Sequence, residues 1–198
     1  MNKALREISE NCIDYLNSLP MVKHCELYGS LASGTEDELS DIDIKVDVSG
    51  CDNGSFMLEV TDLLKDKLNI IFYDYAPSLI PDQYIVSCAV SEENPFAFVD
   101  INCVATPHYT TVSRKRAVNN ALTHTLKVWI ANLKHYSRGA DCYDDIVRMA
   151  NRIGIEGVDS KVEAELLEDT LIWLEQNQTD ELENYIISCR EKFEELMW

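Results

Sequence analysis

The sequence predicts an α+β protein in which a mixed β-sheet flanked by helices precedes a C-terminal bundle of helices. Two observations lead to this prediction. Before residue 105, short runs rich in β-branched and aromatic residues alternate with amphipathic helical segments, whereas after Pro107 apolar residues recur only at helical spacing. We therefore expect one domain over residues 1–110 and a second, all-helical domain over residues 111–198.

The first half is expected to open with a helix that ends at Pro20, because Leu5, Cys12 and Leu16 recur at helical spacing before it. Residues 41–48 alternate strictly between polar and apolar side chains, which is the period of a half-buried strand. A turn is expected over residues 50–54. The remaining elements expected in this half are strands at 23–28, 69–75, 83–90 and 96–104 and a helix at 56–67.

The second half is expected to contain four helices. Apolar residues from Val118 to Leu133 lie on one helix face, and a second helix over residues 143–150 stops before Gly154. Ser160 and Glu163 have the spacing of a capping box and predict the start of a third helix. The fourth helix is expected over residues 182–196.

Composition narrows the function classes. A formal net charge of -18 argues against broad nucleic-acid binding and against anionic lipid, because both require a basic surface. No run approaches the roughly 20 apolar residues of a membrane span, and the acidic N-terminal stretch does not resemble a signal peptide, so we expect a cytoplasmic protein. The seven cysteines are scattered without a C-x-x-C pair, which predicts reduced thiols rather than disulfides or a zinc site.

Two aspartates in an otherwise apolar strand are the main candidates for chemistry. Asp41 and Asp43 are separated by one residue, so their side chains share a face with Cα atoms roughly 6.7 Å apart. Such a pair suits Mg²⁺, which prefers carboxylate oxygens and keeps positions open for water and nucleotide phosphates. Asp100 interrupts a later apolar strand and could complete a two-metal site for in-line phosphoryl chemistry on a nucleoside triphosphate (NTP). Asp74 is a rival for this third position, and Glu92 and Glu93 are weaker rivals.

Phosphate contacts are expected elsewhere in the chain. Gly29 and Ser30 follow the first strand, where a small residue allows close backbone approach to a phosphate and a hydroxyl can donate to it. The basic run at residues 113–116 makes Arg114 and Lys115 candidates for a further contact, although such runs are more often solvated. His124 and Lys127, which share a face of the next helix, are weaker candidates.

The pattern resembles the nucleotidyltransferase superfamily that includes DNA polymerase beta. An apolar strand, Gly29-Ser30, a short helical connection, the run Asp41-Ile42-Asp43-Ile44 and a later acid at Asp100 carry this resemblance, which covers roughly residues 23–104. It is most similar to the small bacterial members that modify aminoglycosides or lincosamides and to the minimal nucleotidyltransferases. The resemblance implies Mg²⁺, an NTP substrate, phosphate contacts at Gly29 and Ser30, metal ligands at Asp41 and Asp43, and a ligand or base at Asp100.

The resemblance leaves three functional hypotheses. The first is transfer of a nucleoside monophosphate to a hydroxyl of a small molecule, with an antibiotic as the leading acceptor, since an acidic surface attracts polycations. The second is modification of a protein partner, as in antitoxin-type minimal nucleotidyltransferases. The third is a degenerate nucleotide-binding module. The acceptor, the preferred NTP base and the oligomeric state stay open at this point.

Overall fold

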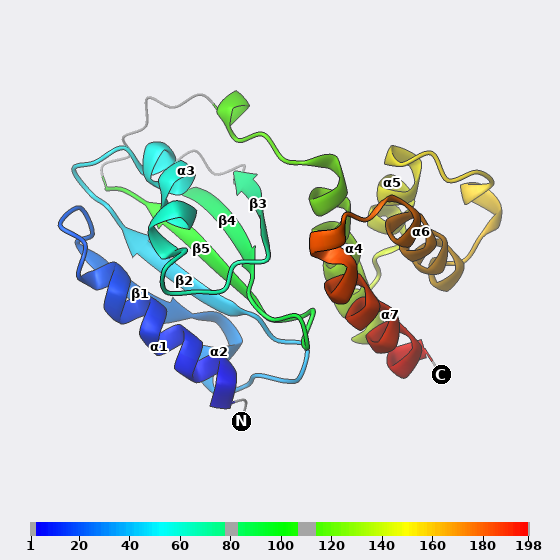
Figure 1. Ribbon diagram of the computed structural model, residues 1–198, viewed down its shortest axis with the longest axis horizontal. Helices are drawn as coiled ribbons and strands as arrows, with labels where there is room; N and C mark the ends of the chain where they lie inside the picture. The colour runs from blue at the N-terminus through cyan, green and yellow to red at the C-terminus, as the bar shows by residue number, and fades with distance from the viewer. Residues whose placement is uncertain (1–2, 78–82, 107–113, 198) are drawn as a thin grey trace. The chain divides into compact units, whose positions relative to one another are not determined.

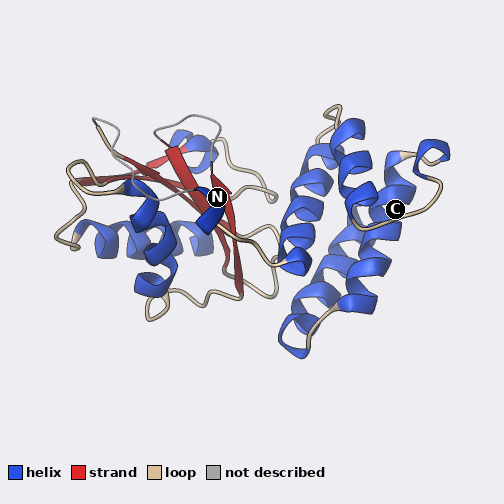
Figure 2. Cartoon of the chain, turned by 90° about the horizontal axis from the view of Figure 1, so that it is seen from above, coloured by secondary structure: helices blue, strands red, loops and turns tan. Residues whose placement is uncertain are grey.

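The computed structural model describes residues 3–77, 83–106 and 114–197, and these fall into two compact units. The first unit comprises the described residues of 1–91 and 96–119, and the second comprises residues 92–95 and the described residues from 120 onward. The strands, drawn in red in Figure 2, belong to the first unit, whereas the second consists of helices and loops.

The first unit is built on a mixed five-stranded sheet with the order β1-β2-β5-β4-β3 (Figure 1). The central strands β2 and β5 run parallel, and each of the other neighbouring pairs is antiparallel. The fold class predicted from the sequence, a mixed sheet with flanking helices followed by further helices, is therefore confirmed. The strands are β1 (His24–Tyr28), β2 (Ile42–Asp47), β3 (Phe72–Pro77), β4 (Gln83–Ala89) and β5 (Phe98–Val104).

Two helices cover the apolar face of this sheet. Helix α1 (Lys3–Asn17) packs on β1 and β2, and helix α3 (Asn53–Leu64) packs on β4 and β5 (Figure 1). The strand residues Ile44 and Ile101, both 0% exposed, lie side by side in the core beneath them. Because strand side chains alternate between faces, the polar residues of β2 and β5 must lie on the opposite side of the sheet.

Several predicted boundaries in this unit shift by a few residues. The turn predicted over residues 50–54 is wrong at its end, because α3 already begins at Asn53. Asp52 is the N-cap of that helix, and its carboxylate accepts a hydrogen bond from the Ser55 N–H at 2.9 Å. The strand predicted from residue 69 begins only at Phe72, and β2 begins at Ile42, so that Asp41 immediately precedes it.

The second unit is a set of helices packed around α6. Helix α6 contacts each of the other three, and the buried Trp129 of α4 donates its indole N–H to the carbonyl of Leu167 in α6 at 2.8 Å. None of the helices in the described part of the chain is long and apolar enough to cross a membrane. The four helices are α4 (Ala121–Ser137), α5 (Tyr143–Arg152), α6 (Glu163–Asn177) and α7 (Glu183–Met197).

Two sequence predictions for this unit are wrong. Val118 does not contribute to the first helix face, since α4 begins after its N-cap Asn120 and Val118 is 72% exposed. Ser160 does not cap α6, because it ends a short 3₁₀ helix. Helix α6 instead follows Val162, whose N–H donates to the carboxylate of Glu165 at 3.1 Å. A glutamate two residues beyond the predicted one therefore makes the bond that fixes the helix start.

Candidate active site

One row of side chains crosses the polar face of the sheet. Asp43 of β2 pairs in register with Asp100 of β5, and Tyr28 of β1 flanks Asp43 on the other side. Beyond Asp100 the same row continues through Ser87 of β4 to Asp74 of β3. Because neighbouring strands lie about 4.8 Å apart, the backbones of Asp43 and Asp100 are in direct lateral contact.

The register separates the candidate third carboxylates. Asp100 is the cross-strand neighbour of Asp43, whereas Asp74 lies two strands further on, roughly 10 Å from Asp100. Asp100 is half-buried, while Asp74 is only 2% exposed. The weaker candidates, Glu92 and Glu93, are exposed and belong to the second unit. The structure thus brings Asp100, and not Asp74, next to the Asp41-Asp43 strand.

Gly29 provides the space that the Asp43 carboxylate occupies. It has a φ of +70°, a left-handed conformation that favours glycine, at the junction between β1 and helix α2 (Gly29–Ser33). A Cβ atom at this position would lie only 2.1 Å from Asp43 Oδ2. The glycine is therefore required both by its backbone angle and by the carboxylate packed against its Cα atom.

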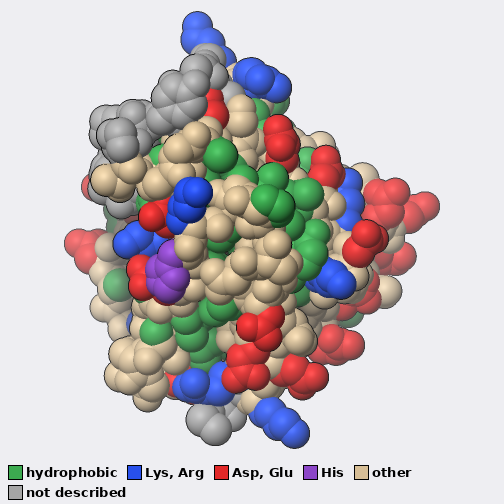
Figure 3. Space-filling view, turned by 90° about the vertical axis from the view of Figure 1, so that its left-hand side faces the viewer, with side chains coloured by type: hydrophobic (Ala, Val, Ile, Leu, Met, Phe, Trp, Pro, Cys, Tyr) green, Lys and Arg blue, Asp and Glu red, His purple; other side chains and the backbone are tan. Residues whose placement is uncertain are grey.

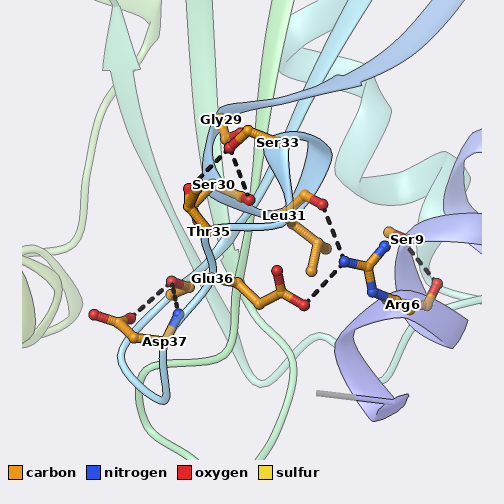
Figure 4. Close-up of polar contacts among 10 residues, drawn as sticks. Arg6, Ser9, Gly29, Ser30, Leu31, Ser33, Thr35, Glu36 and Asp37 are labelled. Carbon is orange, nitrogen blue, oxygen red and sulfur yellow. Dashed lines mark hydrogen bonds and ion pairs between the residues drawn. The ribbon is translucent and has the colours of Figure 1, made fainter. Parts of the chain in front are cut away.

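The segment after Gly29 is held by contacts with α1 and with itself (Figure 4). Arg6 of α1 donates from Nη2 to the Leu31 carbonyl at 3.3 Å and to Glu36 Oε1 at 2.9 Å. The side chain of Glu36 is 6% exposed, and the hydrogen bond from Arg6 lowers its pKa. The hydroxyl of Ser33 donates back to the Gly29 carbonyl at 3.0 Å. These bonds fix the backbone that carries Gly29 and the half-buried Ser30.

The pKa of Tyr28 responds to three aspartates of this part of the sheet. Burial, followed by the charges of Asp43, Asp100 and Asp41, together raise the pKa of Tyr28 to about 12. A hydrogen bond with the side chain of Asn102 acts in the opposite direction. A phenolate at this position would be repelled by the carboxylates, which favours the neutral hydroxyl. The charges of all three carboxylates are therefore felt at the hydroxyl of Tyr28, at the end of β1.

This arrangement predicts the effect of removing one carboxylate. Asp43→Asn and Asp100→Asn should each lower the pKa of Tyr28 below about 12, because each removes a charge that opposes phenolate formation. Ultraviolet titration measures phenolate formation, and Tyr28→Phe identifies the contribution of Tyr28 among the nine tyrosines. Asp47→Asn, on the same face of β2 but paired with His24, is the control and should leave the titration unchanged. Identical curves for all four proteins with Tyr28 would refute this effect of the carboxylates.

The donor set suits a hard divalent cation. Within residues 3–77, 83–106 and 114–197, no three His, Cys, Asp or Glu side chains lie close enough together to hold a metal by themselves. Magnesium, however, is usually bound by one or two carboxylates, with water and substrate phosphates as the other ligands. Asp43 and Asp100 on adjacent strands, with Asp41 immediately before β2, fit that mode of binding.

Of the two basic residues predicted to contact phosphate, the structure describes the side chain of one. Lys115 is exposed on the 3₁₀ helix Arg114–Arg116, whereas the side chain of Arg114 lies outside what the structure describes. Both residues belong to the first unit, the one that carries the carboxylates. Their proposed contact with phosphate stays a prediction.

Some residues of this site were not identified from the sequence. Tyr28 directly precedes the Gly-Ser pair, and Asn102 follows Asp100 by two residues. This closeness in sequence to the candidate residues is the signal that could have identified both as part of the site. The Ser87 hydroxyl is buried between Asp100 and Asp74 in the row, with no hydrogen-bond partner within the described structure. The contact of Arg6 with Glu36 joins residues 30 positions apart, and no local pattern indicates it.

Comparison with known families agrees with the geometry. Residues 10–90 match the family model described as "Polymerase beta, Nucleotidyltransferase". The matched segment contains Gly29, Ser30, Asp41 and Asp43, and it ends before Asp100. A search of curated proteins found no match. The match supports the nucleotidyltransferase superfamily for the sheet-containing unit, and nucleotidyl transfer as the general activity.

Proposed function

We propose that this protein transfers a nucleoside monophosphate from an NTP to a hydroxyl group of a small molecule and releases pyrophosphate. The observation that carries the proposal is the register of β2 and β5, which sets Asp43 beside Asp100 at the point where Gly29 closes on the Asp43 carboxylate. Gly29 and Asp43 lie within the segment that matches nucleotidyltransferases, whereas Asp100 lies beyond its end. Fold and family match support nucleotidyl transfer, and the acceptor class is our extension.

In the proposed reaction the acceptor oxygen forms a bond to the α-phosphorus of the NTP, and the bond from that phosphorus to pyrophosphate breaks. Asp41, Asp43 and Asp100 would hold Mg²⁺, which when bound neutralises phosphate charge and favours deprotonation of the acceptor hydroxyl. Asp100 accepts the proton that the acceptor hydroxyl loses. Ser30 donates its hydroxyl to a phosphate oxygen, and the missing Cβ of Gly29 lets the backbone approach it.

The proposal of a small acceptor rests on the charge of the chain. The net charge of -18 favours a cationic molecule, and polyamine antibiotics such as aminoglycosides combine positive charge with many hydroxyl groups.

Mass spectrometry tests the proposal directly. The protein is incubated with each NTP, Mg²⁺ and a panel of aminoglycosides, lincosamides and other hydroxylated compounds, with Asp43→Asn as the inactive control. A mass increase of one nucleotide on a small molecule, absent with the variant, is the expected result. Nucleotide transfer to protein side chains alone would contradict the acceptor class but retain nucleotidyl transfer. No transfer and no NTP binding under any condition would contradict the activity itself.

The basic residues at the end of the first unit provide a separate prediction. The double variant Arg114→Gln with Lys115→Gln should raise the KM for NTP with little change in kcat, because a lost phosphate contact weakens binding of ground state and transition state alike. Steady-state kinetics measure both constants. Lys65→Gln, an exposed base on the same unit that pairs with Asp62, is the charge control. An unchanged KM in the double variant would identify the two bases as merely solvated.

A further inference from the structure

A cavity in the second unit lies between helices α4 and α5, and its lining includes His124 and Lys127, the weaker candidates of the sequence analysis, but none of the carboxylates assigned above. It has a volume of about 360 Å³ and is lined only by side chains of these two helices. Ligand pockets in proteins begin at roughly 300 Å³, so the cavity is large enough for a small organic molecule. The lining residues of α4 recur every three or four positions and therefore share one face of that helix, and the same is true of the lining residues of α5.

The lining of this α4–α5 pocket is basic. Lys127, Arg148 and Arg152 line it together with a single carboxylate, that of Asp145, which leaves a surplus of two positive charges. Asp145 pairs with Arg148 at 2.8 Å, and both side chains are more than half exposed, so this pair remains open to exchange with a ligand.

This lining contrasts with the unit around it. From Asn120 to Trp198 the sequence contains sixteen Asp or Glu against eight Lys or Arg, so acids outnumber bases two to one. A pocket with three bases and one acid reverses that ratio. On the face shown in Figure 3, which belongs to the sheet-containing side of Figure 1, the described Lys and Arg side chains are interspersed with Asp and Glu. The pocket therefore offers a locally basic surface within an acidic unit.

The remaining lining residues supply neutral donors and apolar contacts. Asn132 is 4% exposed, and its amide nitrogen is bonded to the Met149 sulfur at 3.6 Å. A thioether is a weak acceptor, so an anionic oxygen would compete well for this amide. The imidazoles of His124 and His135 also line the pocket, and either tautomer of a neutral imidazole carries an N–H donor. Val128 and Ala131 add apolar surface.

We propose that the α4–α5 pocket binds a small organic phosphate, with the phosphate held by Lys127, Arg152 and the Asn132 amide and an apolar body held against Val128 and Ala131. A phosphate monoester carries a charge near -2 at neutral pH, which matches the surplus of two positive charges in the lining. Its oxygens accept from both ammonium and guanidinium donors. The proposal concerns binding in the second unit and is independent of the proposed transferase reaction.

Titration of the full-length protein with phenyl phosphate, followed in ¹H–¹⁵N spectra with EDTA present, tests the proposal. We expect saturable shifts of amides in α4 and α5. The double variant Lys127→Gln with Arg152→Gln should weaken binding by about tenfold or more, since hydrogen bonds to charged groups typically have that effect. Ala131→Phe, which fills the cavity without changing charge, should weaken it as well. Arg138→Gln, at the end of α4 but outside the lining, is the charge control and should bind normally.

Two further probes define the ligand class. Phenol lacks the charge and inorganic phosphate lacks the apolar body, so both are expected to bind more weakly than phenyl phosphate. Equal affinity for either of these probes, unchanged affinity in the double variant, or shifts restricted to the first unit would each overturn the proposal. Far-ultraviolet circular dichroism confirms that the variants fold, and their substituted side chains are at least partly exposed.

Discussion

Replacing Gly29 with Ala is expected to abolish nucleotidyl transfer and to destabilise the first unit. The added Cβ would lie 2.1 Å from Asp43 Oδ2, so the carboxylate must leave the position in which it faces Asp100. The left-handed φ of +70° adds about 1–2 kcal/mol of strain for a residue with a Cβ. Turnover with the accepted NTP and denaturant unfolding measure the two effects. Loss of activity should be larger than the loss of folded protein explains.

Gly34→Ala is the matched control for this prediction. Gly34 caps the same short helix with a φ of +72°, but an added Cβ at this position meets nothing within 4 Å. The Gly34→Ala variant should therefore be destabilised by the backbone strain alone, with no carboxylate displaced, and it should retain most of its activity. If Gly34→Ala and Gly29→Ala lost equal activity, strain in the loop rather than the Asp43 contact would be the cause.

Replacing Asp100 with Asn should lower kcat by a factor of about 10² to 10⁴, the usual contribution of a general base, while NTP binding falls much less. The register of β2 and β5 places Asp100 directly beside Asp43. The amide of the Asn variant has nearly the shape of the carboxylate, but it cannot accept the proton of the acceptor hydroxyl. Single-turnover kinetics and equilibrium NTP binding separate the two effects. Asp41→Asn and Asp43→Asn should behave differently, with loss of Mg²⁺-dependent NTP binding itself.

Asp74→Asn is the matched substitution for Asp100→Asn. It makes the same chemical change in the same row of the sheet, but two strands further away and at a buried position. After correction for the folded fraction, this variant should retain activity. An active Asp100→Asn protein together with an inactive Asp74→Asn protein would move the third carboxylate to β3.

The sequence by itself determined the local part of this site. The strict alternation at residues 41–48 predicted the polar face of β2 that carries Asp43, because the period of a strand is two residues whatever it pairs with, while Asp41 immediately precedes the strand. Helical periodicity after Pro107 likewise predicted an all-helical second half, which the structure contains in α4 to α7. Local capping was less predictable, since Glu165 rather than Glu163 bonds the backbone at the start of α6.

Only the tertiary structure decided which acids meet. Asp43 and Asp100 are 57 residues apart in the sequence, and two strands lie between them along the chain but not in the sheet, where β2 and β5 are neighbours. Which strand lies beside which is decided by the packing of the whole unit, in which α1 contacts β1 and β2 and α3 contacts β4 and β5, and the pattern of one strand does not specify its neighbour. The close approach of the Asp43 carboxylate to Gly29 also depends on tertiary structure, because the two residues meet only when β1 and β2 pair. Side-chain period is a property of the local backbone, whereas the neighbour of a strand is a property of the whole fold.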